Sequence, residues 1–147
     1  MKIFFLLAIL FHFNTTFCQD SLQYKNKIDS ILFSRANDGV KIIKAKEGST
    51  RLRYFFVRAT KILDLIEVAE PIDDKEVWIY NYHFYNGKLI MLNKYNNHGI
   101  KDKKREIAFY YLKDGIIYYR EENKTKISDL ELRIKKGMEL QQNSPSY

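Results

Sequence analysis

Two turn dipeptides constrain the fold of this chain more than any other feature. Asn86-Gly87 stands within FYNGKLIML and Asp114-Gly115 within YYLKDGIIYY, each between runs rich in aromatic and β-branched residues. Both dipeptides tolerate the positive φ angles that a two-residue hairpin turn requires. A third segment, RLRYFFVRATKILDLIEVAE, has the same outline, with its tip near Ala59-Thr60 and no glycine. The tips lie 27 and then 28 residues apart, and this regular step predicts a repeated hairpin.

The segments that flank these turns predict the strands of one sheet. Three hairpins in series give an antiparallel meander of six strands from Arg51 onward. A strand over Val40–Lys46, turning through Glu47-Gly48-Ser49, could add a seventh. Residues 61–69 fit either a strand or a helix, because the apolar residues of KILDLIEVA satisfy both periodicities.

The clearest alternation runs through residues 77–85, where every second side chain of a strand points to the same face. One face is wholly aromatic, and we expect it to meet the core: Trp78, Tyr80, Tyr82 and Phe84. The other face is mixed and should be partly exposed to water: Ile79, Asn81, His83 and Tyr85. The pairing of the next strand stays open. A two-residue turn places Leu89 opposite Phe84, and a three-residue turn places Lys88 there.

Two amphipathic segments are predicted to flank the sheet as helices. Asp20-Ser21 can cap the first, which should end near Asn37-Asp38-Gly39. Its mostly apolar stripe has helical spacing: Tyr24, Ile28, Ile31, Leu32 and Arg35. The second begins at Ser128-Asp129-Leu130-Glu131, which fits a capping box. Its inner face is Leu130, Ile134 and Met138, and Gly137 should weaken or end it.

These elements together predict an α+β fold. An antiparallel meander of about six strands carries an N-terminal and a C-terminal helix, because its apolar face needs cover. We expect a single domain over residues 19–142 and a disordered tail over residues 143–147.

The first eighteen residues have the layout of a secretory signal peptide. Lys2 precedes a mostly apolar run over Ile3–Phe13, and a polar exit follows. That run is too short for a helix to cross about 30 Å of hydrocarbon, so no transmembrane segment is expected after processing. Cleavage between Cys18 and Gln19 would release a secreted or periplasmic chain without cysteine, and therefore without a disulfide or a thiolate nucleophile. The alternative is a lipoprotein anchored at Cys18.

A basic surface is the most suggestive candidate for function. The net charge is +7, and +6 once Lys2 is removed with the signal peptide. Lysines and arginines fall on neighbouring predicted strands with aromatic residues among them, and the candidate surface for an anionic partner is Lys44, Arg51, Arg53, Tyr54 and Arg58. In an envelope the available partner is an anionic component or a protein rather than nucleic acid. The competing interpretation is that cations on edge strands prevent aggregation of sheets.

Catalytic signals are sparse. Acids cluster at Glu67, Glu70, Asp73, Asp74 and Glu76, and paired acids in a cleft could hydrolyse a glycosidic bond. His83 and His98 are the histidines left after processing, and zinc would need both of them to converge with a carboxylate such as Asp102. No nucleophile elbow, P-loop or dinucleotide fingerprint is present, and no cofactor is expected.

At the hairpins, YNGKL and LKDGIIYY resemble the turns of MORN-type and related β-repeat proteins. The layout of a signal peptide, a helix and hairpins is similar to small envelope proteins of Gram-negative bacteria. This resemblance covers residues 77–122 and implies an extended sheet used for contact or scaffolding. The sequence therefore favours an exported non-catalytic binding or scaffold protein. The alternative is a small extracytoplasmic hydrolase that uses the acidic 67–76 region with a histidine.

Overall fold

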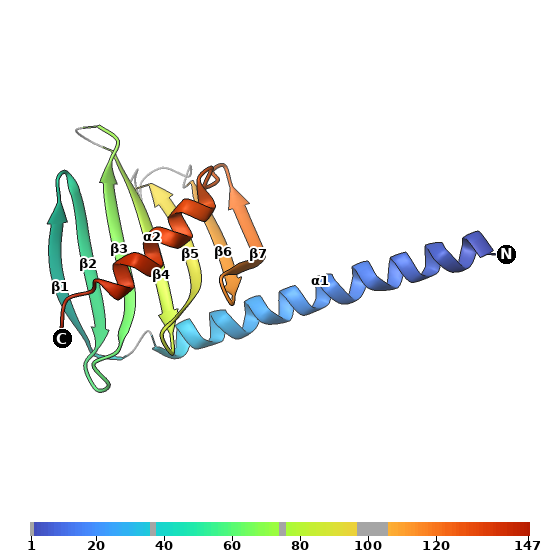
Figure 1. The fold of residues 1–147 in the computed structure, drawn as a ribbon, viewed down its shortest axis with the longest axis horizontal. Helices are drawn as coiled ribbons and strands as arrows, with labels where there is room; N and C mark the ends of the chain where they lie inside the picture. The colour runs from blue at the N-terminus through green and yellow to red at the C-terminus, as the bar shows by residue number, and fades with distance from the viewer. Residues whose placement is uncertain (1, 36–37, 74–75, 97–105) are drawn as a thin grey trace.

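The computed structural model describes residues 2–35, 38–73, 76–96 and 106–147, with side chains from residue 19 onward. It contains two helices and one antiparallel sheet of seven strands in sequence order (Figure 1): α1 (Lys2–Arg35), β1 (Val40–Glu47), β2 (Thr50–Val57), β3 (Leu63–Pro71), β4 (Val77–Tyr85), β5 (Lys88–Asn96), β6 (Ile107–Lys113), β7 (Ile116–Asn123) and α2 (Leu130–Gln142). The α+β class and the two flanking helices are confirmed.

The sheet has seven strands rather than about six, because β1 pairs with β2 along its whole length. The pairing runs from Val40 opposite Val57 to Glu47 opposite Thr50. Gly48 closes this hairpin with a φ of 59°. In the segment 61–69, which fitted either a strand or a helix, the residues from Leu63 onward belong to strand β3.

The turn chemistry read from the sequence sets the register of two hairpins. Asn86 and Gly87 have φ angles of 49° and 73°, and Asp114 and Gly115 have 51° and 81°. Positive φ at both central residues is the type I′ geometry that suits a two-residue hairpin. Phe84 accordingly lies opposite Leu89, and the shift between His83 and Phe84 leaves Ile90 as a bulge.

The main core lies between the sheet and α2, which crosses one face diagonally (Figure 1). Tyr80, Tyr82 and Phe84 are buried there, as their alternation predicted. Ile134 and Leu140 of α2 are also buried, whereas Met138 is 41% exposed and is not a core residue. The predicted capping box does not form: Asp129 is the N-cap residue and makes no side-chain capping bond. Its carboxylate instead accepts a hydrogen bond from Arg133 Nε at 3.0 Å.

Gly137 neither ends nor interrupts α2, which corrects the sequence-based expectation. The helix continues to Gln142, and Gly137 lies directly against the buried ring of Tyr82. A Cβ atom at this position would lie 2.7 Å from Tyr82 Cε1 and nearer still to Cδ1. The absence of a side chain therefore allows α2 to approach the sheet closely.

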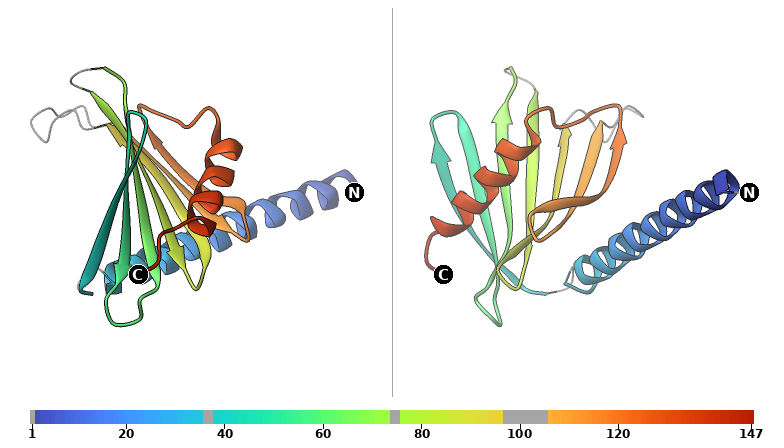
Figure 2. Two further views of the ribbon diagram at one scale, coloured as in Figure 1. Left: turned by 60° about the vertical axis from the view of Figure 1, so that its left-hand side comes forward. Right: turned by 45° about the vertical axis from the view of Figure 1, so that its right-hand side comes forward.

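Helix α1 packs on the other face of the sheet (Figure 2). It is continuous from Lys2 to Arg35, so Asp20 and Ser21 lie inside the helix and do not cap it. The predicted stripe does meet the sheet, with Ile28 buried among Ile90, Met91 and Tyr111. These contacts cover β5–β7, and α1 reaches β3 and β4 through Arg35, which binds the Phe84 carbonyl at 3.0 Å and pairs with Asp64.

The last residues of the chain lie against β1 and β2 rather than forming a free tail. The Tyr147 ring meets the Phe56 ring edge to face, with 5.9 Å between centroids. The Lys41 ammonium lies 4.3 Å from the centroid of the same Tyr147 ring. Among the helices of the described residues, none combines the length and apolar character needed to cross a membrane.

Candidate functional site

The side of β1–β4 that faces away from α2 is only partly covered, and we call it the open face. Period-two alternation places its side chains: Leu52, Tyr54 and Phe56 of β2 point towards α2, so Arg51 and Arg53 point the other way. Strand pairing then aligns a polar row across four strands: Lys44, Arg53, Glu67 and Asn81.

A groove of about 340 Å³ is hollowed into the open face. This volume lies at the lower end of the range for small-molecule sites, which is about 300–1,000 Å³. The residues that line this groove come from all four strands: Lys44, Ala45, Arg51, Leu52, Arg53, Glu67, Ala69, Val77 and Ile79. It therefore combines three cations and one carboxylate with an apolar wall.

An ion pair between Arg53 and Glu67 lies in this groove. Arg53 Nε donates to Glu67 Oε1 at 2.8 Å, and Nη2 contacts the same oxygen. Glu67 is only 8% exposed, and a carboxylate with so little access to water needs a partner of this kind. The Arg53 guanidinium also lies 6.0 Å from the Phe55 ring centroid, which helps to fix its position.

Lys44 and Arg51 supply the uncompensated charge of the groove. Both side chains are exposed, and within the described part of the chain neither has a carboxylate partner. Three cations against one carboxylate leave the groove positive. Exposed cations without partners attract anions over a distance of roughly one Debye length, about 8–10 Å at moderate salt.

Of the five residues predicted for an anionic partner, the structure brings three together. Lys44, Arg51 and Arg53 line the groove. Tyr54 lies on the opposite face, 4% exposed beneath α2. Arg58 follows the end of β2, where its Nε donates to the Val40 carbonyl at 3.0 Å, outside the groove.

Glu67 is the groove residue that sequence reasoning missed. Its neighbours along the chain are other acids, whereas its neighbour in the sheet is Arg53 across the β2–β3 pair. The alternation of RLRYFFV placed the arginines on one face. No feature of the glycine-free turn between β2 and β3 indicated which residue of β3 stands opposite them.

The acidic 67–76 region does not form a two-acid cleft among the described residues. Glu67 and Glu70 point to opposite faces of β3 and are bound by different cations. The Asp73 carboxylate accepts a hydrogen bond from the Glu76 amide at 2.7 Å, within the loop between β3 and β4. Asp74 lies outside the described residues.

His83 does not meet these acids in the part of the chain that can be described. His83 Nε2 lies 2.9 Å from Asn93 Oδ1 on the sheet. Burial lowers the pKa of His83 to about 4, so its ring is neutral at pH 7. His98 and the basic residues of 101–105, with Asp102 among them, lie outside the described residues. Within them, no group of three or more His, Cys, Asp or Glu side chains could hold a metal ion.

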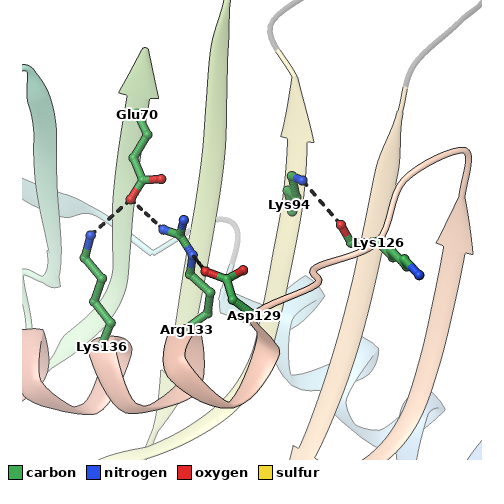
Figure 3. A network of polar contacts seen from close by, with 6 residues as sticks. All are labelled: Glu70, Lys94, Lys126, Asp129, Arg133 and Lys136. Carbon is green, nitrogen blue, oxygen red and sulfur yellow. Dashed lines mark hydrogen bonds and ion pairs between the residues drawn. The ribbon is translucent and has the colours of Figure 1, made fainter. Parts of the chain in front are cut away.

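A second charged network ties α2 to the sheet (Figure 3). Glu70 Oε1 accepts hydrogen bonds from Arg133 Nη1 at 2.5 Å and from Lys136 Nζ at 3.0 Å. Burial raises the pKa of Glu70, but these two donors outweigh it and hold that pKa below its usual range. Arg133 also stacks on Tyr80, with 4.2 Å to the ring centroid. The cations of this network are paired within the molecule, unlike Lys44 and Arg51.

Comparison with known proteins gives no match: no family model, no curated protein and no solved structure is significantly similar to this chain.

Proposed function

We propose that this chain is an exported, non-catalytic binding protein of the bacterial envelope, which contacts an anionic partner through the open face of its sheet. One observation carries the proposal. The groove on the open face holds Lys44 and Arg51, exposed and without carboxylate partners in the described chain, beside an apolar wall. A signal-peptide layout at residues 1–18 supports export.

The physical basis is electrostatic attraction at a partly enclosed surface. Two unit charges 4 Å apart interact by about 4 kcal/mol at the effective dielectric near a protein surface, and salt screens this attraction. Binding should therefore weaken as ionic strength rises. The two free cations should contribute more than cations that already have carboxylate partners.

The test is a titration with a general polyanion, fluorescently labelled heparin, at 20 mM and 200 mM salt. The groove variant Lys44→Glu/Arg51→Glu is compared with the wild type and with a control of equal charge change, Lys126→Glu/Lys135→Glu. Both control residues are exposed and lie outside the groove.

We expect the groove variant to lose at least about tenfold in affinity and the control variant less than about threefold. The reason is that only the groove variant reverses charges inside the groove. Binding should also fall steeply with salt. Equal losses in the two variants would show attraction by net charge alone. Absence of binding at 20 mM salt would refute the proposal.

A further inference from the structure

The carboxylate of Glu67 is unfavourable in a groove whose only role is to attract anions, because it repels them. An anion that enters meets the Glu67 carboxylate, paired with Arg53, beside the free cations Lys44 and Arg51. An apolar or amide residue at this position would leave Arg53 free for the ligand. The groove therefore contains a group that a simple polyanion cannot use.

Glu67 offers the groove a hydrogen-bond acceptor. Both bonds from Arg53 end on Oε1. Among the described residues, no hydrogen-bond donor reaches Oε2. Oε2 is also absent from the fully buried polar atoms that lack a partner, so it is not fully buried. An ionised carboxylate accepts hydrogen bonds and donates none. A ligand that uses Oε2 must therefore supply an O–H or N–H donor.

The rest of the groove restricts that ligand further. Lys44 and Arg51 favour a negative group, and Ala69, Val77 and Ile79 present carbon surface. The volume of about 340 Å³ suits a unit of roughly one sugar ring. A ring that carries a carboxylate, several hydroxyls and an apolar C–H face satisfies all of these features together.

We infer that the anionic partner is an acidic sugar chain, whose units combine a carboxylate with hydroxyl groups. The inference rests on the proposed function and specifies its ligand. Lys44 and Arg51 bind the carboxylate of one unit. Glu67 Oε2 accepts a hydrogen bond from one of its hydroxyls, and Arg53 holds the Glu67 side chain in position.

The test compares two probes with equal numbers of carboxylates: an oligogalacturonate, which has hydroxyl donors, and an oligoacrylate, which when ionised has neither O–H nor N–H donors. Each is titrated against the wild type and Glu67→Gln at low salt. For the oligogalacturonate we expect Glu67→Gln to weaken binding about fivefold to tenfold, because a charge-assisted acceptor is lost. For the oligoacrylate we expect the same variant to tighten binding, because a repulsive charge is removed and no donor loses its acceptor.

A second comparison needs no variant and so does not depend on how Glu67→Gln folds. O-acetylated oligogalacturonate keeps its carboxylates and loses its hydroxyl donors, and the wild type should bind it at least about fivefold more weakly than the parent. If Glu67→Gln tightens binding of both probes, or acetylation has no effect, the sugar assignment is overturned while anion binding stands. If the wild type binds neither probe, both proposals fail.

Discussion

Replacement of Gly137 by alanine tests the packing of α2 on the sheet. In an isolated helix this change stabilises by about 1 kcal/mol, because glycine is a poor helix former. Here the new Cβ would lie 2.7 Å from Tyr82 Cε1, and the Tyr82 ring is 0% exposed. Because that ring has no solvent to move into, either the ring or the helix must shift. Overpacking of this kind costs about 1–3 kcal/mol, and so close an approach to a fully buried ring belongs in the upper half of that range. After the gain of about 1 kcal/mol in helix propensity, we expect a net loss of about 1–2 kcal/mol.

Urea unfolding followed by circular dichroism measures this loss as a lower midpoint at an unchanged m-value. The matched control is Gly39→Ala, whose Cβ would meet only Arg58 Cδ at an ordinary 3.6 Å. The control should be neutral or gain about 0.5 kcal/mol. The reasoning is refuted if Gly137→Ala is as stable as the control. In a Tyr82→Leu background, Gly137→Ala should cost less stability than it does in the wild type, since the smaller side chain makes room for the methyl group.

Two further predictions concern His83 and the start of the mature chain. The pKa of folded His83 is about 4 against 6.5 unfolded, so the unfolded state takes up a proton first as pH falls. The free energy of unfolding should therefore drop by up to about 3 kcal/mol between pH 6.5 and 4. Urea titrations at several pH values should show a flatter dependence for His83→Gln. Equal dependence on pH in the wild type and the variant would contradict this role of His83. The intact mass of the protein from its native host should correspond to a chain that starts at Gln19. A mass that starts at a lipidated Cys18 would establish the anchored alternative, and an uncut chain would remove the export proposal.

Much of the sheet could be predicted because turn chemistry is local. Positive φ at two successive residues favours Asn-Gly and Asp-Gly, and both turns have that geometry. The aromatic alternation of WIYNYHFY placed Tyr80, Tyr82 and Phe84 in the core for the same reason, since side-chain direction in a strand depends only on position parity.

The predictions that were wrong concern features that depend on contacts between residues distant in sequence. A glycine within a helical segment indicates a weak point only if nothing packs on it, and the contact of Gly137 with Tyr82 cannot be read from either sequence neighbourhood. The two predicted helix caps were wrong for another reason. Asp20-Ser21 has capping chemistry, but helical backbone continues on both sides of it. Asp129 is an N-cap residue whose side chain binds Arg133 instead.

The groove was predictable only in part. Arg51 and Arg53 share a face by parity, and Tyr54 between them is directed to the opposite face by the same rule. Lys44 joins the arginines because β1 and β2 form a hairpin in which Lys44 lies opposite Arg53. The position of Glu67 beside Arg53 needs the register of β2 with β3, and the turn between them carries no dipeptide signal for it.

The most direct test of the central claim is to map where an anionic sugar binds, by NMR of the ¹⁵N-labelled chain titrated with oligogalacturonate. We predict that amide shifts move with dose at Lys44, Arg53, Glu67 and Ala69 across β1–β3, and that those of α2 stay unchanged. The same titration of Lys44→Glu/Arg51→Glu should leave all of these signals in place. Shifts centred on α2 or α1, or shifts that persist in that variant, would contradict the assignment of the open face as the binding surface.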